Sequence, residues 1–279
     1  VFEAADGRIV AFRPEENAKR LIMSCERIFI PPVPESLFLE AIDRVVAANA
    51  RFVPPFGTGA SLYVRPVIIG AGPKVGLGPA DEYIFIVFVT PVGPYYKGGF
   101  KPVKALVVEQ FDRAAPNGVG DCKVGGNYAA GLSGGEYGKK QGYPIVLYLD
   151  PKEKKYIDEF STSNFIGIKG DTYLCPESRT ILPSITNKSL ADISETMGMK
   201  KEKRPITIDE VESFDEVGAV GTAAVITPVS SIHYRDREFV FCEGDKPGPV
   251  ISELYSRLTK IQTGEIEDQF GWLREIKPS

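Results

Sequence analysis

The sequence predicts an α/β fold of two domains, in which the larger domain carries mixed, largely antiparallel sheets. Three observations support this prediction. A chain of 279 residues can bury a large core and commonly forms more than one domain. A stretch rich in proline and glycine, residues 91–102, is the best candidate for a linker. Segments with strand and helix patterns follow one another on both sides of it. We therefore expect a small N-terminal domain at residues 1–90, an interdomain loop at 91–102 and a large domain at 103–279.

The first domain begins with a strand at residues 7–12, after an Asp6-Gly7 turn. Pro14 then opens a helix that carries two glutamates in its first turn, where the helix dipole favours acids. A second helix starts near Pro34, and strands follow at residues 61–70 and 83–91. The two-residue period of a strand places Tyr63 and Arg65 on one face. Such a pair can receive a carboxylate, or it can be an ordinary surface pair.

In the second domain, the strands predicted between residues 143 and 174 are separated by short turns, which favours antiparallel pairing among them. We expect a strand at 103–109, a helix at 128–141 weakened by glycines, and strands at 143–149, 156–159, 165–169 and 172–174. A helix at 185–197, capped by Thr186 or a neighbour, offers N–H groups to an anion. A short helix at 206–212 precedes residues 218–227, which read as a strand or as a ligand-binding turn. The last helix covers 249–261.

Composition excludes several classes of function. The net charge of −4 and the lack of a basic stripe argue against nucleic acid as a partner. The longest apolar run, residues 83–89, is too short to span a bilayer, and no signal peptide is visible, so we expect no membrane partner and a cytoplasmic location. The four cysteines are not close neighbours, which argues against zinc and for reduced thiols. A single histidine, His233, weakens any Ser-His-Asp or Cys-His mechanism.

The most informative stretch is Gly118-Val119-Gly120-Asp121-Cys122-Lys123-Val124-Gly125-Gly126-Asn127-Tyr128. Its glycines permit sharp turns and close approach of another molecule. It departs from a P-loop, which needs Gly-Lys-Ser/Thr, and from a dinucleotide fingerprint, which needs a glycine where Lys123 stands. A lysine in such a loop can lose its proton and act as a nucleophile. Considered alone, the loop reads more simply as a surface turn with a solvated lysine.

Other motifs give the lysine a context. The helix start at Thr186 and the Gly-Thr turn at Thr222 can each take a phosphate, and the carboxylate Glu159 precedes small hydroxyl residues. A lysine, a phosphate cradle and a lone acid are what a pyridoxal phosphate enzyme needs. The sequence resembles the branched-chain amino acid aminotransferases, class IV aminotransferases of fold type IV. The stretches that carry the resemblance span nearly the whole chain: Ala11-Phe12-Arg13-Pro14, Ser61-Leu62-Tyr63-Val64-Arg65-Pro66, the lysine loop, residues 159–165, Leu182-Pro183-Ser184-Ile185-Thr186 and Gly221-Thr222-Ala223-Ala224.

The resemblance implies a role for each matched residue. Lys123 would bind pyridoxal 5′-phosphate covalently and move the proton, and Glu159 would pair with the pyridine nitrogen. Tyr128 would hydrogen-bond the ring hydroxyl. The phosphate would be held by Arg13, Ile185, Thr186 and Thr222. The substrate would meet Tyr63, Arg65, Tyr95, Thr222 and Ala223, and Arg113 and Thr162 are weaker assignments.

The resemblance also implies an activity and an assembly. Leucine, isoleucine or valine would donate its amino group, and 2-oxoglutarate would accept it and become glutamate, in a homodimer. Three features depart from the family. The chain starts where members already have a preceding segment, which we expect to be missing, and Ala224 and Thr227 replace a redox Cys-x-x-Cys. The last departure is that Cys175 and Pro176 stand near a position at which members of the class often have threonine. Alternatives are a D-amino acid aminotransferase or an aminodeoxychorismate lyase of the same fold, or a non-catalytic relative.

Overall fold

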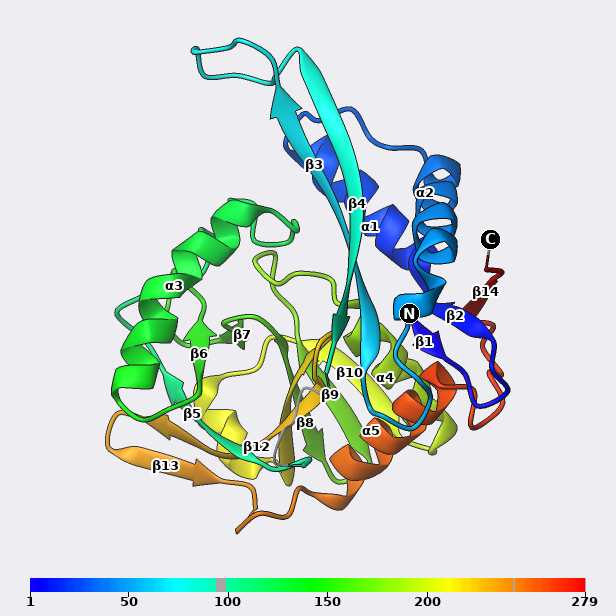
Figure 1. Cartoon of the computed structure of the whole chain (residues 1–279). Coiled ribbons are helices and arrows are strands. Elements are labelled where there is room, and N and C mark those ends of the chain that lie inside the picture. The colour runs from blue at the N-terminus through cyan, green and yellow to red at the C-terminus, as the bar shows by residue number, and fades with distance from the viewer. Residues whose placement is uncertain (94–98, 243, 279) are drawn as a thin grey trace. The chain divides into compact units, whose positions relative to one another are not determined.

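The computed structural model describes residues 1–93, 99–242 and 244–278. The chain forms two compact units. Unit 1 comprises Val1–Tyr95 together with Thr259–Ser279, and unit 2 comprises Tyr96–Leu258. Figure 1 shows the course of the chain through its labelled elements. Within the described residues, no helix is long and apolar enough to cross a membrane.

Unit 1 contains two small sheets and, in its N-terminal segment, two α-helices. Strands β1 (Phe2–Glu3), β2 (Ile9–Phe12) and β14 (Leu273–Ile276) form one sheet, and β3 (Ser61–Ala71) and β4 (Glu82–Val92) form a long antiparallel hairpin. Helix α1 (Pro14–Arg27) begins at the predicted proline, α2 (Glu35–Ala48) follows it, and a 3₁₀ turn, η1, covers Ala50–Phe52. One face of the hairpin packs on α2, where Phe85 stacks on Phe38 at 6.2 Å between ring centroids.

The C-terminal tail belongs to unit 1, whereas the sequence assigned residues 103–279 to the large domain. Strand β14 pairs with β2 in antiparallel register, from Leu273↔Phe12 to Ile276↔Ile9. Arg274 reinforces this pairing through a two-pronged ion pair with Asp43 of α2, at 2.6 and 3.0 Å. Backbone pairing therefore brings the last strand to the first elements of the chain.

Unit 2 is built on a sheet of mixed direction, in the order β10-β9-β8-β11-β12-β5-β6-β7, with β13 on β12. Its pairings close into a ring, because β7 also pairs with β8 through Glu159 and Asn164. The antiparallel pairing predicted for the strands between residues 143 and 174 holds for β6–β7, β7–β8 and β8–β9. Outside that group, β5–β6 and β9–β10 are parallel. The strands are β5 (Val103–Val107), β6 (Ile145–Leu149), β7 (Ile157–Phe160), β8 (Asn164–Lys169), β9 (Thr172–Pro176), β10 (Lys200–Arg204), β11 (Glu216–Gly221), β12 (Val225–Tyr234) and β13 (Arg237–Val240).

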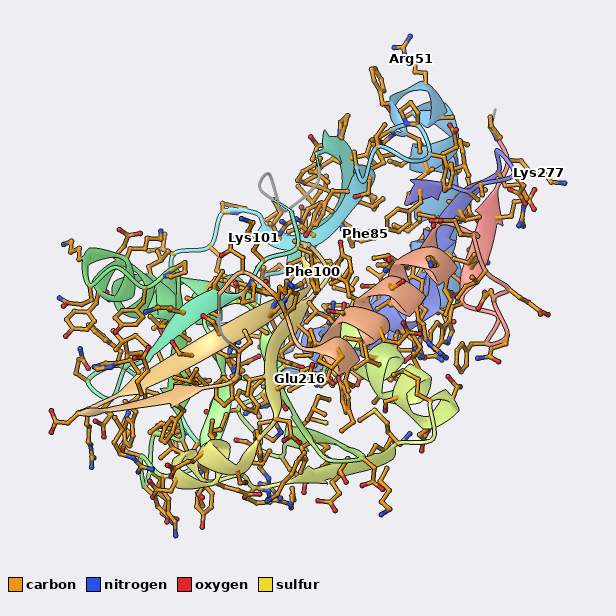
Figure 2. All side chains as sticks on the ribbon, turned by 90° about the horizontal axis from the view of Figure 1, so that it is seen from below. Arg51, Phe85, Phe100, Lys101, Glu216 and Lys277 are labelled. Carbon is orange, nitrogen blue, oxygen red and sulfur yellow. The ribbon has the colours of Figure 1, made fainter. Side chains whose placement is uncertain are left out.

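Helices complete unit 2. Helix α3 (Gly125–Lys140) starts three residues before its predicted position, and α4 (Ile185–Thr196) lies where it was expected. The short helix η2 (Ile208–Ser213) is a 3₁₀ helix. Helix α5 (Pro249–Gln262) begins in unit 2 and ends in unit 1. The buried carboxylate of Glu216, labelled in Figure 2, belongs to the first residue of β11. It accepts hydrogen bonds from the N–H groups of Val250 and Ile251 and so caps the first turn of α5.

Candidate active site

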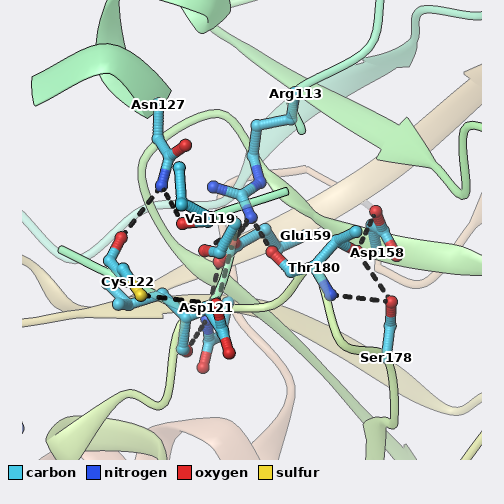
Figure 3. A network of polar contacts seen from close by, with 12 residues as sticks. Arg113, Val119, Asp121, Cys122, Asn127, Asp158, Glu159, Ser178 and Thr180 are labelled. Atoms are coloured by element: carbon cyan, nitrogen blue, oxygen red, sulfur yellow. Dashed lines mark hydrogen bonds and ion pairs between the residues drawn. The ribbon is translucent and has the colours of Figure 1, made fainter. Parts of the chain in front are cut away.

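The loop that carries Lys123 is held from within. A Cβ on Gly120 would lie 2.4 Å from the carbonyl oxygen of Thr180, so only glycine fits there. The amide of Asn127 donates to the carbonyl oxygens of Val119, at 2.6 Å, and Cys122, at 2.9 Å (Figure 3). These contacts fix the backbone on both sides of the turn. The lysine side chain itself is exposed to solvent in the single chain.

Lys123 and Tyr128 form the reactive pair of this loop. The Lys123 Nζ lies 2.6 Å from the phenolic oxygen of Tyr128, which stands in the first turn of α3. An amine becomes a nucleophile towards a carbonyl carbon once it is neutral. A phenol at hydrogen-bonding distance can orient that amine and exchange a proton with it. The spacing of five residues thus places an amine and a phenol side by side.

Glu159 is the buried acid of unit 2, with 4% of its surface exposed. Its Oε1 lies 2.6 Å from Arg113 and 3.3 Å from the N–H of Leu182, and its Oε2 accepts from Asn164 at 2.7 Å. Burial raises the pKa of this carboxyl to about 7, against the opposing effects of Arg113, Leu182 and Asn164. A carboxyl with such a pKa can hold or release a proton near neutral pH.

Arg113 joins the acid to the lysine loop. Besides its ion pair with Glu159, it donates to the carbonyl oxygens of Gly120, at 3.1 Å, and Thr180. Figure 3 shows these contacts converging on its guanidinium group. Asp158 lies next to this cluster and accepts from the Thr180 hydroxyl at 2.6 Å. Over the described residues, Arg113 Nε and Asp158 Oδ1 are the buried side-chain polar atoms without a hydrogen-bond partner.

Two backbone features can hold an anion. Ser184 caps α4 by accepting from the N–H of Asn187 at 3.1 Å, so the predicted cap is the neighbour of Thr186 rather than Thr186 itself. Ile185 and Thr186 are the first two helical residues, and N–H groups there have no partner within the helix. The turn at residues 222–224 joins β11 to β12 and leaves Thr222 and Ala223 exposed. Val225 ends that turn at φ 60°, which is strained for a β-branched residue.

The structure brings together several predicted residues of unit 2. Thr162 lies in the β7–β8 connection, and its carbonyl oxygen is 3.7 Å from where a Cβ on Gly221 would be, just before the Thr222 turn. Lys123 contacts Tyr128, and Arg113 contacts Glu159. Arg113 links the two pairs, because it also donates to the backbone of the lysine loop at Gly120.

The other predicted residues belong to unit 1 or lie outside the description. Arg13 is buried at the start of α1 with φ 48°, and its guanidinium carbon lies 4.5 Å from the centre of the Trp272 ring. Tyr63 and Arg65 share a face of β3, with the guanidinium carbon 5.0 Å from the tyrosine ring centre. Tyr95 lies outside the described residues.

Similarity to known proteins agrees with these features. The family model described as amino-transferase class IV matches residues 1–232. The branched-chain-amino-acid aminotransferase of Helicobacter pylori is 45% identical over 278 residues, which are 99% of this chain and 81% of the relative. The chain belongs to the class IV aminotransferases. The branched-chain-amino-acid aminotransferase of Haemophilus influenzae is 44% identical over 283 residues, covering 99% of this class IV aminotransferase and 82% of the relative.

Solved structures give the same fold. The Escherichia coli branched-chain amino acid aminotransferase matches with a TM-score of 0.85 and 28% identity, covering 99% of this class IV aminotransferase and 88% of that chain. The T.th. branched-chain amino acid aminotransferase, solved with pyridoxamine 5′-phosphate, matches with a TM-score of 0.86 and 26% identity over 99% and 87% of the two chains. The predicted family, fold class, enzyme class and pyridoxal 5′-phosphate cofactor are confirmed.

The residues of unit 2 fit this cofactor. The amine of Lys123 can bind the cofactor's carbonyl carbon, the Tyr128 phenol can meet its ring hydroxyl, and the buried carboxyl of Glu159 suits its ring nitrogen. The first N–H groups of α4 suit its phosphate. Where the structure describes the chain, it has no group of three or more His, Cys, Asp or Glu side chains that could hold a metal ion.

The sequence did not assign a role to two asparagines that the structure places at the site. Asn127 closes the lysine loop, and Asn164 bonds Glu159 across the β7–β8 pair. Both stand inside the motifs quoted for the family, so their positions were visible. Their bonds were not, because each reaches a backbone or a side chain whose position depends on the folded loop.

Proposed function

We propose that this class IV aminotransferase transfers the amino group of L-leucine, L-isoleucine or L-valine to 2-oxoglutarate, giving branched-chain 2-oxo acids and L-glutamate. The single observation that carries the chemistry is the Lys123–Tyr128 pair, with 2.6 Å between the amine and the phenol, on a loop bonded through Arg113 to the buried Glu159. The substrate assignment is supported by relatives at 43–45% identity that are named for branched-chain amino acids.

Each site residue has a proposed task. Lys123 binds the cofactor and moves the proton at the substrate α-carbon, and Tyr128 orients the lysine Nζ. Glu159 holds the proton at the ring nitrogen, and Arg113 keeps that carboxyl in place. When bound, pyridoxal 5′-phosphate supplies the ring that accepts the electron pair left on the substrate. The proposed phosphate contacts are Arg13, Ile185, Thr186 and Thr222.

The substrate residues are part of the same proposal. Arg65 and Tyr63 offer a cation and a phenol on one strand face, suited to a carboxylate. Thr222 and Ala223 present an exposed turn in unit 2, with Thr162 close to its start. Tyr95 is assigned from the sequence alone. Arg13, Tyr63 and Arg65 belong to unit 1.

We further propose that the enzyme is a homodimer in the cytoplasm. The outward face of β4 exposes Ile84, Ile86 and Phe88, and a contiguous apolar face of this kind commonly marks a protein interface. All four cysteines are free, as in a reducing compartment. The net charge of −4 remains the argument against a nucleic-acid partner.

An amino-transfer assay tests the substrate assignment. Purified protein loaded with pyridoxal 5′-phosphate is given 2-oxoglutarate with either L-leucine or D-alanine, and glutamate is measured. We expect turnover with L-leucine and a rate at least about a hundredfold lower with D-alanine, because a site shaped for one hand misplaces the other enantiomer's α-hydrogen. Faster turnover of D-alanine would instead favour the D-amino acid aminotransferase, and release of an aromatic amine from aminodeoxychorismate would favour the lyase.

A further inference from the structure

A chain of side-chain hydrogen bonds runs from Glu159 into the interior of unit 2. The Tyr173 hydroxyl donates to Asn187 Oδ1 at 2.8 Å, and Asn187 Nδ2 donates to Asn164 Oδ1 at 3.3 Å. Asn164 Nδ2 then donates to Glu159 Oε2 at 2.7 Å. These four residues, here called the Glu159 relay, come from β9, α4, β8 and β7. Separate elements of unit 2 thus meet on one carboxyl group.

The relay has one direction of donation. Asn164 Nδ2 faces two acceptors, Glu159 Oε2 and the carbonyl oxygen of Leu182 at 3.1 Å, so Asn164 Oδ1 is left to accept. Asn187 must therefore present its Nδ2 to Asn164 and its Oδ1 to Tyr173. The phenol keeps its proton, because burial raises the pKa of Tyr173 well above its ordinary value. Each of the two asparagines accepts from the residue behind it and donates to the next residue towards Glu159.

Buried asparagines and tyrosines commonly do no more than satisfy one another's hydrogen-bonding groups. Whether this relay has a function therefore depends on Glu159, the residue at its end. A donor to an ionised carboxyl favours the charged form. The charged or titratable groups that face Glu159 are Arg113, which favours its ionisation, and Asp158, which opposes it. Cys175 is the titratable group that faces Tyr173 and Asn187. Burial is the largest influence on Glu159 and favours its neutral form, so the relay and Arg113 act together against it.

Asn187 also ties the relay to the predicted phosphate site. It is the third residue of α4, and its backbone N–H donates to the side-chain oxygen of the capping residue Ser184. Ile185 and Thr186, the proposed phosphate contacts, stand directly before it. A shift of this helix turn would therefore move the Asn187 amide and, through Asn164, change the hydrogen bond to Glu159.

We infer that Tyr173 and Asn187 are positioning residues that act through Asn164 to hold the Glu159 carboxyl ionised and in one orientation for the ring nitrogen of the cofactor. This inference rests on the proposed role of Glu159. Neither residue touches the cofactor in this scheme. Their effect reaches the reaction only through the relay.

The test is a titration of Glu159 in cofactor-free protein labelled with ¹³C at the glutamate carboxyls. The Glu159 resonance is assigned by its loss in Glu159→Gln. Tyr173→Phe removes one oxygen and leaves an amide acceptor without its donor, so we expect the Glu159 pKa to rise by about half a unit. We also expect pyridoxal phosphate to dissociate about threefold more readily. Tyr234→Phe, which removes a hydroxyl bonded to Glu109 and takes no part in the relay, is the control and should leave both values unchanged.

Asn187→Asp gives a second variant should Tyr173→Phe fail to fold. Its carboxylate cannot donate to Asn164 Oδ1, so Asn164 must turn its amide nitrogen away from Glu159, and the Glu159 pKa should rise further. A Glu159 titration that matches the parent protein in the folded variant overturns the inference, whether or not the cofactor binds. Equal binding of pyridoxal phosphate by the parent and by Glu159→Gln would instead overturn the assigned role of Glu159.

Discussion

Glu159 shows how one buried residue can make stability depend on pH. Its carboxyl is enclosed by Arg113, Asn164 and the Leu182 N–H, yet burial still raises its pKa from 4.5 to about 7. A raised pKa means that the folded protein binds this proton more tightly than the unfolded chain does. The stability that results is fully present below about pH 4.5 and is lost as the pH rises through about 7.

Glu159→Gln should remove this pH dependence. We expect the free energy of unfolding of the cofactor-free parent, minus that of the variant, to fall as the pH rises from about 4.5 to about 7. Urea unfolding followed at several pH values measures this difference. Glu109→Gln is the control of opposite sign, because Arg235 lowers the pKa of Glu109 and its contribution is lost as the pH falls below about 4.5. If the difference in free energy of unfolding between the parent and Glu159→Gln does not change with pH, the raised pKa of Glu159 would be contradicted.

Helix α3 shows how packing at the scale of an element overrides sequence propensity. Its glycines weakened the prediction, yet it runs for 16 residues. Gly134 and Gly138 lie against β6, where an added Cβ would come 2.2 Å from the Tyr148 hydroxyl and from Val146 Cγ1, respectively. The glycines therefore allow a close approach of helix to strand that no larger residue permits. Gly135, next in sequence, faces open space.

These adjacent glycines make a matched pair for mutation. Gly134→Ala should destabilise the protein by about 1–3 kcal/mol, because a methyl group has no room beside Tyr148. Gly135→Ala should stabilise it by about 0.5–1 kcal/mol, since alanine restricts the unfolded chain and favours a helix. Thermal or urea unfolding distinguishes the two. Equal effects of both substitutions would mean that α3 does not pack on β6 as described.

Elements with a clear apolar pattern were predictable, and elements fixed by distant pairing were not. The helices that begin at Pro14 and at Ile185 and the hairpin strands follow from local signals. Strand β10 reads Lys-Lys-Glu-Lys-Arg and shows no apolar alternation, because its side chains are mostly exposed and β9 fixes it by backbone pairing. Strand β14 likewise depends on β2, far away in the sequence. At the site, Lys123 and Glu159 were visible as residue types, whereas their bonds to Tyr128 and Arg113 needed the fold.

At the scale of the whole molecule, the exposed face of the β3–β4 hairpin bears on assembly. Ile84 is 48% exposed and lies opposite Ile69, which is 46% exposed. If a second copy covers this face, light scattering should give twice the 30.5 kDa mass of one chain. Ile84→Glu should shift the protein towards the monomer, because it would bury a charge in the interface.

Val240→Glu is the control for this prediction. Val240 is an exposed apolar residue of β13, at 60%, outside the hairpin. The variant should keep the mass of the parent protein. A parent protein of single-chain mass, or an Ile84→Glu variant that stays dimeric, would contradict the proposed interface.

The central claim is that Lys123 carries the cofactor, and reductive trapping tests it most directly. Protein loaded with pyridoxal 5′-phosphate is treated with borohydride, which fixes the bond between an amine and the cofactor's carbonyl carbon, and peptide mass spectrometry locates the adduct. We expect the adduct on Lys123, with loss of that adduct when L-leucine is added before the reductant. An adduct on another lysine, or a Lys123 adduct that L-leucine leaves unchanged, would contradict the account.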